Sequence, residues 1–254
     1  GPPMTPLRFY AARTLRNEPM LRSLSVPLSE LVAQLGGKRV ALVGNARSLA
    51  EGTQGAQIDA ADLVVRMNRA PMPAPESHGT RTDWLALAVR LPQADRARLA
   101  PGRILWMSPK RKRLDWRTAR APGFYLHPLS DYRALKARLA APPTTGAMMI
   151  DLCLRSGLAR LDLYGFDFFA SQSLSGRRTA AGVRTSARPS TGSAAPNAAT
   201  VGGTTVASAP RSQSRRLVRK ASASASRTPG GRVRVTEPSR RATLSVMRRA
   251  RAVR

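Results

Sequence analysis

Residues 38–71 constrain the fold of this 254-residue chain more than any other stretch, because two apolar segments within it each end at an asparagine. Residues 40–43 form a short apolar run, half of it β-branched, that passes into a glycine and then Asn45. This pattern predicts a buried strand that ends in a tight turn. Residues 62–67 predict a second buried strand, which ends at Asn68 shortly before a proline that stops further pairing.

These two strands would bring two side-chain amides to one edge of a sheet. In an open α/β sheet, ligands bind beyond the carboxyl ends of the strands, where Asn45 and Asn68 can donate to a phosphate, a ribose or a base. An asparagine after a strand also forms turns by bonding its own backbone, and Gly44 also serves where φ is positive. The patterns G-x-G-x-x-G and G-x-x-x-x-G-K-[ST] are absent from this loop. Spacing alone therefore leaves both interpretations open and does not name a ligand.

Helices and strands alternate in the rest of residues 24–170. Residues 26–35 have the apolar spacing of an amphipathic helix, and a glycine pair follows them before the first strand. Further strands are predicted at residues 83–89, 103–107, 124–126 and 162–166. Strands that are joined through helices pair in parallel. The expected fold class is α/β, with a Rossmann-like, mostly parallel sheet flanked by helices.

A second candidate site precedes the last of these strands. Pro143, Thr144, Thr145 and Gly146 end a loop and begin an apolar helix predicted at residues 147–158. The unpaired N–H groups of a helix N-terminus and the threonine hydroxyls suit an anion. Threonine is also an ordinary helix cap, so this pattern too has a purely structural interpretation.

Two ordered motifs carry a family resemblance. The first reads VGN, then S-L, G, ID, D, V and R-x-N-x-AP, and the second reads PTTG, an apolar helix and LDLYGF. They resemble the large and small sialyl motifs of the sialyltransferase family, glycosyltransferase family 29. Between them, GTRTD at residues 79–83 is similar to a segment of bacterial-looking members of the family. The resemblance covers about residues 36–169.

This resemblance implies a chemistry. Family members transfer sialic acid, or a related keto sugar acid, from a CMP-sugar donor to an acceptor glycan with inversion, on a metal-independent variant of the GT-A fold. Carried over by position, the donor-binding residues would be Gly44, Asn45, Asn68, Thr144, Thr145 and Gly146. No cofactor is expected, because the chain has no Asp-x-Asp pair, two distant histidines and one cysteine.

No catalytic residue is assigned. The family's base is a histidine in an H-x-x-x-x-E motif near the C-terminus, and neither this motif nor the His/Tyr motif before it occurs in the sequence. His127 precedes the small motif and is not given the role, and His78 is expected to be an exposed loop side chain. The chain as written is therefore expected to bind CMP with little or no transfer. The alternative is a non-catalytic protein that binds nucleotides or polyanions.

The composition changes abruptly at residue 171. Residues 171–254 contain no aromatic residue and no histidine, and they carry a net charge of +17 out of +29. Such a segment cannot bury enough apolar surface to fold alone, so a disordered basic tail is one interpretation. A reading-frame error in GC-rich DNA is the other, and it is preferred because the family resemblance ends at the same place. The expected organisation is an N-terminal extension (1–23), a nucleotide-sugar-binding domain (24–170) and this tail.

Two basic segments suggest different partners. Residues 4–23 suit either a solvated helix or an amphipathic helix on an anionic membrane surface. Trp106 and Trp116 flank the basic run at 109–113, which fits a nucleic-acid patch or a solvated loop that faces an anionic donor or acceptor. The second is preferred, so no obligate nucleic acid is expected. A lone cysteine, Cys153, excludes an intrachain disulfide, and a cytoplasmic location is expected.

Overall fold

One mixed sheet organises the molecule. The computed structural model describes residues 2–166, 225–228 and 232–235. The strands lie in the order β5-β4-β3-β2-β1-β6-β8-β7, and the pairs from β5 to β6 are all parallel. The parallel strands are β1 (Arg39–Val43), β2 (Leu63–Met67), β3 (Trp84–Leu87), β4 (Arg103–Trp106), β5 (Tyr125–Leu126) and β6 (Arg160–Tyr164). The predicted Rossmann-like parallel sheet is confirmed.

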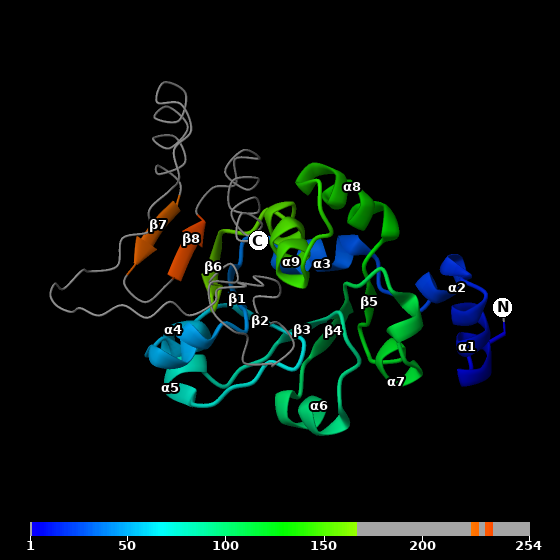
Figure 1. The fold of residues 1–254 in the computed structure, drawn as a ribbon, viewed down its shortest axis with the longest axis horizontal. Helices are drawn as coiled ribbons and strands as arrows, with labels where there is room; N and C mark the ends of the chain where they lie inside the picture. Colours follow the sequence, from blue (N-terminus) through cyan, green and yellow to red (C-terminus); the bar gives the residue numbers. More distant parts are fainter. Residues whose placement is uncertain (1, 167–224, 229–231, 236–254) are drawn as a thin grey trace, which may run out of the picture.

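Helices cover both faces of the sheet, as Figure 1 shows for α8 and α9 on one side and α4, α5 and α6 on the other. The described helices are α1 (Pro6–Thr14), α2 (Glu18–Arg22), α3 (Leu28–Leu35), η1 (Arg47–Glu51), α4 (Gly55–Asp59), α5 (Pro75–His78), α6 (Gln93–Leu99), η2 (Arg111–Arg113), α7 (Trp116–Ala119), α8 (Leu129–Leu139) and α9 (Thr145–Leu154).

Alternation along the strands builds three core clusters on the two faces of the sheet. In β2, Val65 and Met67 join the core under α3, α8 and α9, whereas Val64 points to the other face and packs with η1 and α4. On that second face, a separate cluster under α1, α2, α6 and α7 covers β3, β4 and β5. Cys153 is fully buried in α9, as predicted, and burial raises the pKa of its thiol to about 12. It is a core residue.

Within residues 171–254, the structure describes two strands, β7 (Ala225–Thr228) and β8 (Arg232–Val235). β8 pairs antiparallel with β6, and β7 pairs antiparallel with β8. The sequence RVRV alternates valine with arginine, which is a strand pattern, and the free edge of β6 offers unpaired backbone groups to such a strand. The remainder of residues 171–254, for which disorder or a frame error was predicted, lies outside the described residues.

The N-terminal extension forms two short helices rather than one. Arg16 has φ of 55°, and Asn17 then caps α2 by accepting a hydrogen bond from the backbone N–H of Met20 at 3.1 Å. The buried Phe9, Ala12 and Leu21 fix both helices to the β3–β5 end of the sheet. Among the described residues, no helix is long and apolar enough to cross a membrane.

Candidate functional site

The order of strands places a switch point between β1 and β6. From β1 the chain runs through β2 to β5 on one side and returns to β6 on the other side. The two strand ends are joined beyond the sheet, because Gly44 donates its N–H to Tyr164 O at 2.7 Å and Ala46 donates to Gly165 O at 3.1 Å. In open α/β sheets, ligands bind beyond the carboxyl ends of the strands at such a point.

Glycine is required where these two strand ends meet. A Cβ on Gly44 would lie 2.5 Å from the backbone oxygen of Gly165, and a Cβ on Gly165 would lie 2.7 Å from the backbone oxygen of Gly44. Gly165 also has φ of 65°, which disfavours other residues. The predicted glycine therefore sets a close approach of two backbones, and its partner Gly165 was not predicted as a site residue.

The two asparagines link the ends of neighbouring strands. Asn45 follows β1 and donates Nδ2 to Met67 O, at the end of β2, at 3.0 Å. Asn68 follows β2, and its Oδ1 accepts a hydrogen bond from Ala88 N, just beyond β3, at 2.9 Å. Asn68 has φ of 54°, a conformation that asparagine tolerates better than most residues. Neither hydrogen bond is made within the residue's own turn. The asparagine side chains therefore link the carboxyl ends of β1, β2 and β3.

The start of α9 completes the edge. Thr144 caps the helix by accepting from Ala147 N at 3.1 Å, and Thr145 is buried. A Cβ on Gly146 would lie 2.7 Å from the Phe166 ring and 3.7 Å from the Met67 side chain. Of the predicted residues, Gly44 and Gly146 thus meet at Phe166, and Gly146 and Asn45 lie against Met67. These two apolar residues were missed, since nothing in the sequence distinguishes a site lining from a strand end.

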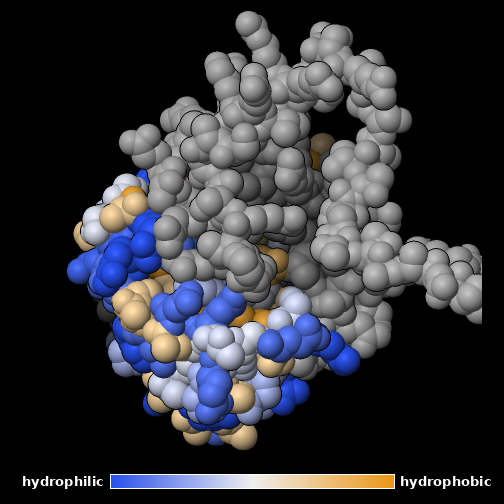
Figure 2. Space-filling view, turned by 90° about the vertical axis from the view of Figure 1, so that its left-hand side faces the viewer, coloured by the Kyte–Doolittle hydropathy of each residue, from blue (hydrophilic) through white to orange (hydrophobic). Residues whose placement is uncertain are grey.

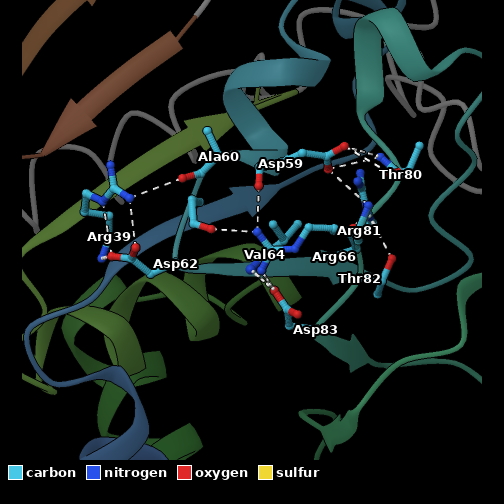
Figure 3. Close-up of polar contacts among 11 residues, drawn as sticks. Arg39, Asp59, Ala60, Asp62, Val64, Arg66, Thr80, Arg81, Thr82 and Asp83 are labelled. Atoms are coloured by element: carbon cyan, nitrogen blue, oxygen red, sulfur yellow. Dashed lines mark hydrogen bonds and ion pairs between the residues drawn. The ribbon is translucent and has the colours of Figure 1, made fainter.

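The opposite ends of β2 and β3 carry a dense charged network, which we call the Asp59 bracket (Asp59, Arg66, Arg81 and Asp83; Figure 3). The Asp59 carboxylate accepts from Thr80 N at 2.9 Å and from Arg81 N at 3.0 Å. The Arg81 guanidinium donates to the backbone oxygen of Asp59 at 2.6 Å and to the Asp83 carboxylate at 2.7 Å. Desolvation raises the pKa of Asp59, but the hydrogen bonds from Arg81 and Thr80 outweigh it, and the net pKa is lowered.

Arg66 anchors this bracket from inside the sheet. It is 1% exposed, and it donates Nε to Arg81 O and Nη2 to His78 O, both at 2.7 Å. Burial lowers its pKa to about 10. The GTRTD segment, predicted from its family resemblance, therefore folds around the arginine of the R-x-N motif.

His78 corrects a prediction. It is 1% exposed rather than an open loop side chain, because the packed turn of α5 places its ring next to Ser77 Oγ, 2.8 Å from Nδ1. Burial, and secondarily the charge of Arg66, lowers the pKa of His78. A neutral buried histidine in this position belongs to the structural bracket.

The basic run at 109–113 is divided between buried and exposed side chains. Trp106 is completely buried, so it cannot stack on a nucleic-acid base. Arg111 is buried as well, and its guanidinium pairs with the Glu18 carboxylate at 2.6 Å. The run is partly a structural clamp that holds α2 to the sheet, and only Lys110, Lys112 and Arg113 remain exposed.

His127 follows β5 at the same edge of the sheet as the asparagines but four strands away from β1. It is 2% exposed, and burial lowers its pKa to about 4. Its Nδ1 lies 3.4 Å from the hydroxyl of Tyr125.

Figure 2 shows the end of the molecule that carries α4 and α5, where hydrophilic residues dominate the described surface. Within the described residues, no group of three or more metal-ligating side chains is present. The six predicted residues at the carboxyl ends of the strands are uncharged glycines, asparagines and threonines.

A mostly parallel α/β sheet with a closely packed switch point defines a Rossmann-like fold. Residues 12–93 match the sequence model of glycosyltransferase family 29 (sialyltransferase). The predicted resemblance to this family is thereby confirmed for residues 12–93, about a third of the chain. No curated protein matches the chain.

Two solved structures of mammalian sialyltransferases are similar to the chain. One, in complex with Gal-beta-1-3GalNAc-ortho-nitrophenol, has 23% sequence identity and a TM-score of 0.44 over 57% of this chain and 62% of that one. The other has 22% identity and a TM-score of 0.45 over 65% of this chain and 66% of that one. The chain thus spans slightly less than two thirds of the length of each.

Proposed function

We propose that the edge formed by Gly44, Asn45, Asn68 and the start of α9 binds the CMP portion of a CMP-sugar donor, sialic acid or a related keto sugar acid. The observation that carries this proposal is the convergence of two sequence-distant motifs at one switch point. Gly44 and Gly146 come from segments far apart in the chain, yet both contact Phe166. The two asparagines, which link neighbouring strand ends, and the two threonines at the start of α9 bring polar side chains to the same point.

The chemistry of the edge supports a nucleoside monophosphate. The hydrogen bond that the Asn68 side chain makes to Ala88 N–H uses only Oδ1, so the donor Nδ2 is not consumed by it. An amide N–H and the first N–H groups of α9 are donors suited to a ribose or a single phosphate. The bound donor would be oriented by hydrogen bonds, and the excess of positive charge on the chain would attract it.

The proposed reaction of the complete enzyme is a single displacement. The acceptor hydroxyl oxygen forms a bond to the anomeric carbon, the bond from that carbon to the CMP oxygen breaks, and a general base takes the hydroxyl proton. The electron pair of the broken bond leaves with CMP. No residue of residues 2–166 is assigned as the base, so we propose that this chain binds the donor with little or no transfer.

The test uses the 254-residue chain and Asn68→Asp. Aspartate keeps the acceptor for Ala88 N–H but replaces the Nδ2 donor by a negatively charged oxygen facing the ligand. We expect saturating CMP, at about 100 times its Kd, to stabilise the parent chain by about 2.7 kcal/mol in a thermal-shift assay. Asn68→Asp should weaken CMP binding tenfold or more, since it removes a hydrogen bond and adds repulsion worth at least about 1.4 kcal/mol.

Asn17→Asp is the matched control. Asn17 also accepts a backbone hydrogen bond, from Met20 at the start of α2, and it lies on the N-terminal extension. This variant should bind CMP like the parent. Equal CMP affinity in Asn68→Asp and Asn17→Asp, or no stabilisation of the parent by CMP, would contradict the proposed donor site.

The alternative function is binding of polyanions without a nucleotide site. It is favoured by the +17 charge of residues 171–254. Binding to a polyanion that falls steeply with salt and is unchanged by Asn68→Asp would support it. Sequencing the coding DNA beyond Phe169 in all three frames decides whether this basic segment is what the cell makes.

A further inference from the structure

The solvent-facing side of α1 carries large hydrophobic side chains. In the described residues, the exposed large hydrophobic side chains are Leu7 (81% exposed), Tyr10 (40%) and Leu15 (78%), and all three lie on α1 or at its C-cap. Leu7, Ala11 and Leu15 are spaced four residues apart, so they form one apolar ridge along the helix. Scattered exposed hydrophobic residues are normal, but a continuous ridge marks an interaction surface.

The exposure of these leucines does not result from poor packing of α1. The opposite face of the helix is well buried through Phe9 and Ala12, and the Phe9 ring packs 5.6 Å from that of Trp116. The Arg13 guanidinium also donates to Leu114 O at 2.8 Å and lies over the Tyr10 ring. α1 is therefore held in one orientation, with its leucines directed outward.

Exposed cations lie on the two elements against which α1 packs. α1 contacts η2 and α7, whose exposed cations include Lys112, Arg113 and Arg117. The acidic residues in the same region are already engaged, because Glu18 pairs with Arg111 and Asp115 pairs with Arg90. The combination of exposed leucines and unneutralised cations is complementary to a surface with both acyl chains and negative charge.

We propose that this end of the molecule, the α1 ridge with the cations of η2 and α7, docks on an anionic lipid membrane. Peripheral membrane binding needs two weak signals together, an apolar insertion and a basic patch, and both occur here. A second copy of the chain fits less well. A stable protein interface needs about 800 Å² on each partner, more than one short helix provides, and two identical basic faces repel one another.

This proposal is independent of the donor site. α1 lies at the end of the sheet next to β5, opposite β7 and β8 (Figure 1), whereas the switch point lies between β1 and β6. Docking through α1 would therefore leave the switch point uncovered by the membrane contact. The two proposals can fail separately.

The first measurement uses an environment-sensitive fluorophore on the full chain. Ala11→Cys places a thiol between the two exposed leucines without removing either, and Ala134→Cys places one on the exposed surface of α8. The native Cys153 is fully buried with a raised pKa, so it should not label. With vesicles of phosphatidylcholine and phosphatidylserine, the label at position 11 should shift to the blue and the label at 134 should not.

The second measurement separates the two signals by vesicle sedimentation at 0.15 M salt. Leu7→Gln combined with Leu15→Gln should lower partitioning about tenfold or more. Lys112→Glu with Arg113→Glu should lower it severalfold, whereas the matched pair Arg133→Glu with Lys136→Glu, on α8, should leave it within about twofold. Circular dichroism checks that each variant keeps its helices.

Three results would overturn the proposal. The first is cosedimentation without a blue shift at position 11, which would assign membrane binding to the basic C-terminal segment alone. The second is unchanged partitioning of the leucine variant. The third is a dimer of the parent chain in solution that the leucine variant converts to a monomer, which would make a second copy the occupant of the ridge.

Discussion

The two ends of the parallel strands differ sharply in chemistry. At the amino ends of β1, β2 and β3, arginines and aspartates pair with one another and with backbone groups, as in the Asp59 bracket and in the Arg39–Asp62 pair (Figure 3). At the carboxyl ends, Gly44, Asn45, Asn68 and the start of α9 are neutral. The charges of this fold are used to hold the loops in place, which leaves the neutral edge free to recognise a ligand by hydrogen bonds.

The largest expected effect on stability comes from replacing Arg66, which holds the loops at the amino ends of the strands. Arg66→Met leaves the backbone oxygens of His78 and Arg81 buried without their donor, so we expect the free energy of unfolding to fall by about 3 kcal/mol or more. Urea denaturation measures it. Arg66→Lys should recover only part of the loss, because one ammonium group cannot reach both oxygens. A loss below about 1 kcal/mol for Arg66→Met would show that the bracket does not depend on this residue.

At the neutral end, the largest effect should come from Gly44→Ala. Its Cβ would lie 2.5 Å from Gly165 O, so the ends of β1 and β6 must separate, at a cost of about 2 kcal/mol together with the loss of CMP protection. Gly36→Ala is the matched control, because a Cβ there meets its nearest atom at 3.4 Å. Calorimetry on both variants tests the close approach directly, and equal stabilities would contradict it.

Acidification should lower the free energy of unfolding through His127. Burial lowers its pKa to about 4 in the folded chain from an ordinary value of 6.5, so the unfolded chain binds a proton first as the pH falls. Stability is then complete above pH 6.5 and declines towards pH 4, by about 2 kcal/mol at pH 5. His127→Phe should flatten this part of the pH profile relative to the parent. The same decline in both proteins would assign it to other groups.

The smallest effect is expected for Asp59→Asn. The amide oxygen still accepts from Thr80 N or Arg81 N, so only the charged part of these hydrogen bonds is lost, about 1 kcal/mol at pH 7. Because the folded pKa of Asp59 is lowered, its contribution is present above the unfolded pKa of 3.8 and disappears as the pH falls through the lower folded value. Denaturation of both proteins at pH 7 and at pH 3 measures this convergence.

The sequence predicted the parallel strands well, because their apolar runs are bounded by glycine, proline and asparagine. The predicted strand at residues 62–67 corresponds to Leu63–Met67, and the one at residues 103–107 to Arg103–Trp106. The turn at Arg16 that divides the N-terminal segment was not predicted. It has φ of 55° without a glycine, and tertiary packing of Phe9 and Leu21 determines it.

The candidate site was predicted in its polar residues but not in its packing. The asparagines and threonines follow recognisable strand and helix ends, whereas the contact of Gly146 with Phe166 depends on how α9 crosses the sheet. The burial of His78 was missed for the same reason. A histidine in a proline-rich segment suggests an open loop, and only the bracket of Arg66 and its partners encloses it.

The position of β1 in the sheet has a consequence for folding. β1 pairs on one side with β2, which is close in sequence, and on the other side with β6, which is distant. Pairings that are distant in sequence form slowly, because a long loop must close before any contact stabilises it. During synthesis, the first half of the ligand edge is therefore complete long before the second half leaves the ribosome. A ligand that needs both halves can bind only to a finished sheet, and its binding would report that folding is complete.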